Sequence, residues 1–228
     1  MHEGHRDRVK KRFRQEGLDH FSDIQALELL LFYGIPRVDT NPIAHALLDR
    51  FGSLSQVLEA SPEELMKVPG VGENAALLLA LIPQMGRFYM VDRSSRVTIL
   101  QTLEQCADFL VPHFFGRKVE TVFILCLDAK CKLLCCKELG EGGPNSTGVS
   151  IRKIVETAIG VNAATVVLAH NHPSGLAVPS AEDIQTTRRI AHALQAVEIT
   201  LADHIIVADG DYVSIAMSDD RFRDCLLI

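Results

Sequence analysis

The stretch LAHNHPSGLAVPSAED, residues 168–183, decides how the second half of this 228-residue chain is interpreted. Its apolar start predicts the end of a strand, where residues two apart point to the same side, about 7 Å apart at Cα. His170 and His172 can therefore converge on one ion. A Pro/Gly-rich turn follows, after which Ser180 and Asp183 open a helix and return a carboxylate to the strand end. Two imidazoles and a carboxylate, with one position left for water, are typical of catalytic zinc.

Three other interpretations compete for this stretch. The S-x-x-D spacing of Ser180 and Asp183 is also that of a helix capping box, which does not exclude a metal. The letters of His170-Asn171-His172 spell HNH, but the nuclease motif of that name is dispersed over a ββα unit. A zinc deaminase requires H-x-E and a later P-C-x-x-C. Residue 172 is His and the sequence has no P-C-x-x-C, so neither enzyme class fits.

Around this stretch, the second half of the chain alternates between helical and strand patterns. Helical periodicity predicts helices at 103–115, 151–159 and 180–196. Apolar, β-branched runs predict strands at 119–127, 132–138, 165–170, 199–207 and 212–215. Alternating elements of this kind indicate an α/β domain.

The first 92 residues instead predict helices alone. Apolar residues recur with a helical period at 21–33 and 41–51, and Ser61-Pro62 begins a further helix. Another helix is expected at 74–85, bent or shortened by Pro83. The polar segment Arg93–Arg96 is the expected boundary, giving a helical domain at 1–92 and an α/β domain at 97–228.

A glycine turn separates the last two predicted helices of the first half. LMKVPGVGENAALLLAL resembles a helix-hairpin-helix motif, with Gly34-Ile35-Pro36 as the hairpin of a degenerate first copy. Gly70 and Gly72 permit a tight turn whose amides can hold a DNA phosphate without reading sequence. The simpler interpretation is that two helices need a compact connection.

Charge limits any nucleic-acid role of this half. The net charge is −6, and residues 1–92 hold more acidic than basic residues. Glu73 follows Gly72 directly and would repel a phosphate. The basic stretch 6–14, which includes Arg12, would attract phosphate and partly offsets this repulsion. We therefore expect weak, non-specific DNA binding or protein docking, and no tight DNA binding.

Composition places the chain among cytoplasmic globular proteins. Hydrophobic residues make up 47%, which predicts a packed core. No apolar run reaches the roughly 18 residues that a membrane span needs, and the charged N-terminus has no apolar run of a secretory signal. The six cysteines show no CxxC spacing, which favours reduced core thiols. A soft-metal site at Cys131, Cys135 and Cys136 is the alternative.

The spacing H-x-H-x7-S-x2-D, met by His170, His172, Ser180 and Asp183, resembles the JAMM (MPN-plus) metalloprotease signature. The longer string HNHPSG…PS.ED, followed by DHIIV at residues 203–207, more narrowly resembles the RadC family. That family carries a helix-hairpin-helix region before a JAMM-like domain. The resemblance covers nearly the whole chain and implies a cytidine-deaminase-like α/β sandwich that binds Zn²⁺.

The JAMM pattern also requires an upstream glutamate that follows a helix and opens a core strand. Glu120 stands in that place, and Glu138 in the next strand is the competitor. Beside a metal-bound water, such a carboxylate would act as general base and then as general acid.

The resemblance assigns roles to the other residues. The zinc ligands would be His170, His172 and Asp183. Ser180 would stabilise the oxyanion. Asp203 and His204 match a RadC motif, so they would support the ligands from behind or simply make strand hydrogen bonds. One segment departs from the family, which usually has His-Pro-Arg-Glu where this chain has Ser150–Lys153. Only Arg152 matches, so we expect the substrate-contacting loop to differ from that of the family.

The leading hypothesis is zinc-dependent hydrolysis of an amide in a peptide or protein substrate. One alternative is a DNA-binding repair or recombination accessory with a vestigial metal site, and another is a metal-dependent nuclease. The complete Glu/His/His/Ser/Asp set argues against a vestigial site. The acidic balance of the helical half argues against a dedicated DNA enzyme.

Overall fold

The computed structural model describes residues 3–94, 99–142, 144 and 149–218. The chain forms two compact units, residues 1–86 and 87–228, and the division falls inside one long helix. The predicted boundary at Arg93–Arg96 lies partly outside the described residues.

The first unit is helical, as the periodicity predicts. Its helices are α1 (Glu3–Glu16), α2 (Asp23–Gly34), α3 (Asn41–Phe51), α4 (Leu54–Glu59), α5 (Pro62–Leu65) and α6 (Glu73–Ser94). They enclose a core that includes Leu27, Leu47 and Leu79, none of which has exposed surface. The predicted bounds of α3 are confirmed at both ends.

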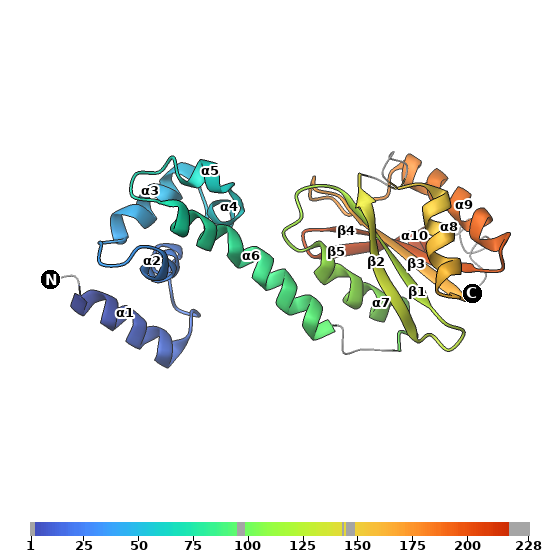
Figure 1. Cartoon of the computed structure of the whole chain (residues 1–228), viewed down its shortest axis with the longest axis horizontal. Helices are drawn as coiled ribbons and strands as arrows, with labels where there is room; N and C mark the ends of the chain where they lie inside the picture. The colour runs from blue at the N-terminus through green and yellow to red at the C-terminus, as the bar shows by residue number, and fades with distance from the viewer. Residues whose placement is uncertain (1–2, 95–98, 143, 145–148, 219–228) are drawn as a thin grey trace. The chain divides into compact units, whose positions relative to one another are not determined.

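The predicted end of α6 is wrong. We expected this helix to end at residue 85 and to be bent or shortened by Pro83, but it continues to Ser94 (Figure 1). A proline removes one backbone hydrogen bond and its ring crowds the preceding turn. The residues beyond it are good helix formers such as Gln84, Met85 and Arg87, so the helix resumes its bonding after that single loss.

The second unit is built on one five-stranded sheet of order β2-β1-β3-β4-β5. Its elements are α7 (Leu103–Leu110), a 3-10 helix η1 (Val111–Phe114), β1 (Thr121–Leu127), β2 (Leu133–Glu141), α8 (Ile151–Gly160), β3 (Thr165–Asn171), α9 (Ala181–Gln195), β4 (Thr200–Ala208), β5 (Asp211–Ser214) and α10 (Ile215–Ser218). Strands β3 and β4 are parallel, and the other pairs are antiparallel. The predicted α/β class is confirmed.

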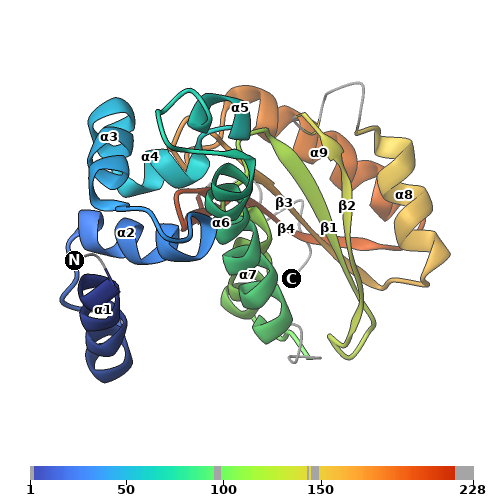
Figure 2. The same ribbon diagram turned by 60° about the vertical axis from the view of Figure 1, so that its left-hand side comes forward.

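Helices cover both faces of this sheet (Figures 1 and 2). Helix α7 packs on one face through Phe109 and Leu110, whereas α8 and α9 pack on the other through Ile154 and Ile190. Strand β1 is therefore buried on both sides, which explains why its sequence is a continuous apolar run without alternation.

The crossover from β3 to β4 positions the residues of the opening stretch. Because β3 and β4 are parallel, the chain must return along the sheet, and it does so through α9. Even-numbered residues of β3, such as Leu168, face α9, and odd-numbered ones, such as Ala169, face α7. His170 therefore points toward the helix that carries Asp183 in its first turn.

Candidate metal centre

The two histidines of the opening stretch converge as predicted. His170 is the penultimate residue of β3 and is fully buried. His172 follows the strand, and its amide still bonds to the carbonyl of Val207 on β4, which continues the strand geometry. The Nε2 atoms of His170 and His172 lie 3.0 Å apart.

Asp183 meets both histidines from the first turn of α9. Its Oδ1 lies 3.3 Å from Nε2 of His170, and its Oδ2 lies 3.5 Å from Nε2 of His172. Burial raises the pKa of Asp183, but the nearby His170 ring and hydrogen bonds from the side chain and amide of Ser180 outweigh it and hold the pKa well below its usual value. The carboxylate is therefore ionised, as a metal ligand must be.

Ser180 caps α9 and holds the same carboxylate. Its hydroxyl donates to Oδ2 of Asp183 at 2.6 Å, and its amide donates to the same atom at 2.8 Å. The Asp183 amide donates back to the Ser180 hydroxyl, which completes a capping box. The capping interpretation of this motif is confirmed, and the cap lies within the cluster of candidate metal ligands.

Glu120 lies beside the histidines, just before β1. Its Oε1 is 3.7 Å from Nε2 of His170, and about a third of its side chain is exposed. In the antiparallel pairing of β1 with β3, Val122 lies opposite His170, so the same register places residue 120 opposite residue 172. Its competitor Glu138 instead forms an ion pair with Arg117 at 2.7 Å.

Asn171 holds the backbone on each side of Glu120. The Thr121 amide donates to Oδ1 of Asn171 at 2.8 Å, and Nδ2 of Asn171 donates to the carbonyl of Val119 at 3.3 Å. Strand β1 begins at Thr121, two residues later than predicted. The residue between the two histidines thus orients the glutamate, a role that the spacing of the motif does not reveal.

These side chains fit a metal ion. Two atoms bound at about 2.1 Å to one tetrahedral zinc are roughly 3.4 Å apart, close to the separations between His170, His172 and Asp183 given above. Glu120, His170 and His172 also form a group whose ligand atoms all lie within 4.8 Å of one another. Glu120 is therefore near enough to act either as a ligand or on a metal-bound water.

Behind His170 lies a second buried histidine. Nε2 of His204, on β4, is 2.8 Å from Nδ1 of His170, and Nδ1 of His204 is 2.6 Å from the hydroxyl of Thr187 on α9. Burial, followed by the nearby charge of His170, lowers the pKa of His204 well below its usual value. Thr187 belongs to no motif of the sequence, and only its position one turn after Asp183 hinted at it.

Asp203 makes the strand-type hydrogen bonds of the simpler interpretation. Its Oδ1 accepts from the amides of His204 and Ala216, which joins β4 to α10. Burial raises the pKa of Asp203, opposed by the Ser214 hydroxyl and by these two amides.

Comparison with known families agrees with this geometry. Residues 100–220 match the model of the RadC-like JAB domain, and residues 3–77 match that of the UPF0758 N-terminal domain. The first match alone spans more than half of the chain. This chain belongs to the RadC family. The resemblance inferred from the sequence is thereby confirmed, together with a JAB/MPN-type fold for the second unit.

Two curated relatives match over nearly the whole chain. UPF0758 protein FN0909 of Fusobacterium nucleatum is 33% identical over 219 residues, covering 93% of this chain and 94% of the relative. UPF0758 protein Bxeno_A3578 of Paraburkholderia xenovorans is 33% identical over 210 residues, covering 92% and 83%. Their names state no activity. Within the described residues, the helices of this RadC-family chain are too short or too polar to cross a membrane.

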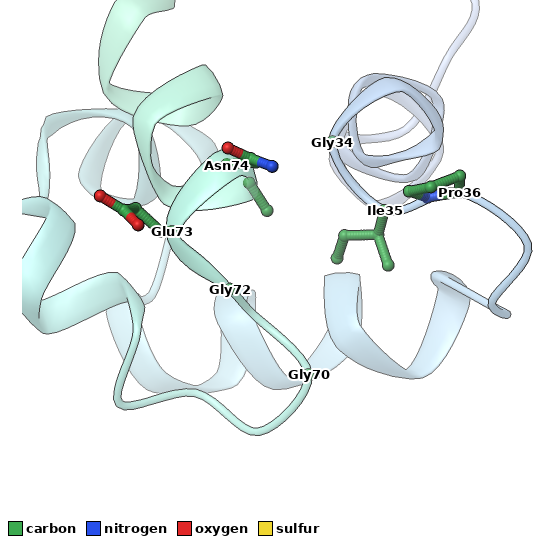
Figure 3. Close-up of a pocket in the computed structure, with 8 residues that line it drawn as sticks. Gly34, Ile35, Pro36, Gly70, Gly72, Glu73 and Asn74 are labelled. Carbon is green, nitrogen blue, oxygen red and sulfur yellow. The ribbon is translucent and has the colours of Figure 1, made fainter.

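In the helical unit, the two glycine turns meet at one pocket of about 330 Å³ (Figure 3). A Cβ on Gly34 would lie 3.0 Å from the Cα of Ala75, so the end of α2 approaches the start of α6 closely. Gly70 has a φ of +89°, and a Cβ there would meet Ile43 at 2.8 Å. Gly72 has no such restriction. Gly70 is thus required by the turn itself.

The charged residues named in the phosphate prediction, Arg12 and Glu73, are less favourable to phosphate than the sequence suggests. Nη2 of Arg12 donates to the carbonyl of His20 at 2.6 Å and Nη1 to Gln25 at 3.1 Å, and the guanidinium stacks on Phe21. Glu73 lines the pocket, although its carboxylate lies on the side of the turn away from Ile35 (Figure 3). Phosphate binding by Gly70, Gly72 and Arg12 stays a prediction.

Proposed function

We propose that this RadC-family chain is a zinc-dependent hydrolase of amide bonds, acting on a peptide or an isopeptide. The observation that carries the proposal is the convergence of His170, His172 and Asp183, at ligand spacing, with Glu120 beside them. Imidazole and carboxylate ligands suit zinc, and three protein ligands leave one position for water.

Bound zinc would lower the pKa of its water toward about 7 and polarise the substrate carbonyl. Glu120 would take the proton of that water and pass it to the leaving amine. Its partial exposure allows it to reach both, since a third of the side chain faces solvent. The backbone bonds of Asn171 on either side would hold this carboxylate in place.

Ser180 would stabilise the oxyanion of the intermediate. Its hydroxyl proton is directed at Asp183, so the hydroxyl must rotate toward the substrate to serve this role. The cap would survive that rotation, because the Ser180 amide still donates to the same carboxylate oxygen.

Metal content and a substrate screen test this function. Elemental analysis of protein purified without metal-affinity resin should find one zinc per chain. His172→Ala should lose it, since two protein ligands make a weak site. The control His192→Ala changes an exposed histidine of α9 and should retain zinc. Stoichiometric zinc in His172→Ala would refute the ligand assignment.

The screen compares peptides, isopeptides and nucleic acids, each with and without chelator. Chelator-sensitive cleavage of an amide substrate is the expected result. Chelator-sensitive cleavage of DNA or RNA, with peptides and isopeptides untouched, would contradict amide hydrolysis and favour the nuclease alternative.

For the helical unit, we propose weak docking to nucleic acid as a second, accessory function. It is supported by the meeting of two glycine turns at the start of α6, where Gly34, Gly70 and Gly72 line one pocket beside a helix N-terminus. The guanidinium of Arg12 is already bonded to Glu16, Gln25 and the His20 carbonyl, so we expect it to strengthen such binding little.

A further inference from the structure

A continuous line of hydrogen bonds joins the backbone of Asp183 to the back of His170. The Thr187 hydroxyl donates to the Asp183 carbonyl at 2.7 Å and contacts Nδ1 of His204 at 2.6 Å. Nε2 of His204 contacts Nδ1 of His170 at 2.8 Å. All four residues are buried, so water does not compete for these bonds.

The hydrogen bond between the Thr187 hydroxyl and the Asp183 carbonyl determines which atom is the donor in each of the other bonds. A carbonyl oxygen only accepts, so the single hydroxyl proton of Thr187 points at Asp183. The hydroxyl oxygen must then accept from Nδ1–H of His204. A neutral imidazole carries one N–H, so Nε2 of His204 accepts, and it accepts from Nδ1–H of His170. Nε2 of His170 is left as a bare lone pair facing the cluster.

We propose that Thr187 and His204 are positioning residues that hold His170 in its metal-binding tautomer. The inference rests on the proposed metal site and adds two residues that touch neither metal nor substrate. Asp183 would act twice, because its carboxylate binds the metal while its own carbonyl sets the tautomer of a neighbouring ligand.

The other histidine ligand supports this interpretation. Nδ1 of His172 lies 3.0 Å from the carbonyl of Leu176, which again can only accept. His172 must therefore carry its proton on Nδ1 and present a bare Nε2. Both histidines therefore carry the proton on Nδ1. His172 donates it directly to a carbonyl, whereas His170 donates it to His204, which is linked through Thr187 to the carbonyl of Asp183.

If each donor and acceptor in this line were exchanged, His170 would be in the tautomer that cannot bind a metal through Nε2. If the Thr187 hydroxyl donated to His204, then Nε2–H of His204 would donate to Nδ1 of His170. The proton of His170 would then sit on Nε2, aimed at Asp183 and blocking the metal. Removing the Thr187 hydroxyl takes away the acceptor of His204 Nδ1–H and allows this reversal.

Zinc affinity of full-length variants tests the proposal, measured by competition with a chromophoric chelator. Thr187→Val keeps the shape but lacks the hydroxyl, and should bind zinc about 10- to 100-fold more weakly. Thr187→Ser restores the hydroxyl and should regain most of the affinity. Thr157→Val removes the same helix-internal bond on α8, where the Thr157 hydroxyl donates to Lys153 at 2.7 Å, and should bind zinc like wild type.

Nitrogen-15 NMR of the histidine rings in metal-free wild type gives a second readout that needs neither zinc nor activity. His204 and His170 should both carry their proton on Nδ1. A proton on Nε2 of His204 overturns the proposal, even if Thr187→Val fails to fold. Wild-type affinity in a folded Thr187→Val also overturns it. Wild type that shows these tautomers but binds no zinc contradicts the proposed function and leaves the tautomer assignment standing.

Discussion

Replacing Asn171 with alanine should destabilise the second unit without touching a proposed ligand. The variant leaves the Thr121 amide without the acceptor that it has at 2.8 Å. Thr121 is only 1% exposed, so water cannot replace that acceptor. A buried amide that loses its partner costs about 1–3 kcal/mol. The second lost bond adds little, because Val119 is 51% exposed and its carbonyl can bond to water.

The predicted loss is therefore about 1–3 kcal/mol in the free energy of unfolding. Urea denaturation followed by circular dichroism measures it, and the exchange rate of the Thr121 amide proton reports the local bond. Asn74→Ala makes the same change at an exposed residue of α6 and should stay within about 0.5 kcal/mol of wild type. Equal stability of Asn171→Ala and wild type, with unchanged protection of the Thr121 amide, would refute the reasoning.

Three further predictions follow from the site and the core. Glu120→Gln should keep its zinc but hydrolyse the amide substrate about 10²–10⁴-fold more slowly, whereas Glu138→Gln should change neither zinc content nor rate. Elemental analysis and the hydrolysis rate of both variants on the substrate found in the screen would check this. Burial, aided by Cys131, raises the pKa of Cys106 to about 12, so iodoacetamide at pH 8 should label Cys106 only after denaturation, as read by peptide mass spectrometry. DNA binding by the full chain should be weak and salt-sensitive in fluorescence anisotropy, and Arg12→Ala should change it little; nanomolar, sequence-selective binding would contradict this.

The sequence alone was sufficient for the order of the five strands and for the histidine pair, although it did not predict α1, α4 or α10. Helical period and strand alternation are local properties, so the bounds of α3 and the strand that carries His170 could be read directly from neighbouring residues. The spacing of His170, His172 and Asp183 is equally local, since one strand end and one helix start hold all three.

Local patterns misjudged the effect of Pro83, because the bonding of the turns on either side decides whether a helix survives one missing amide. They also could not show that Arg12 is already bonded within its own unit. A count of basic residues does not distinguish a cation that faces solvent from one that supports a helix contact.

Tertiary structure decided which glutamate joins the site and what lies behind it. Glu120 reaches His170 because β1 pairs with β3 in one particular register, while Glu138 is held by Arg117. Thr187 meets His204 only because α9 packs across β4. Such contacts join segments far apart in the chain, and they are set by how buried surfaces pack against one another, which no short stretch of sequence encodes.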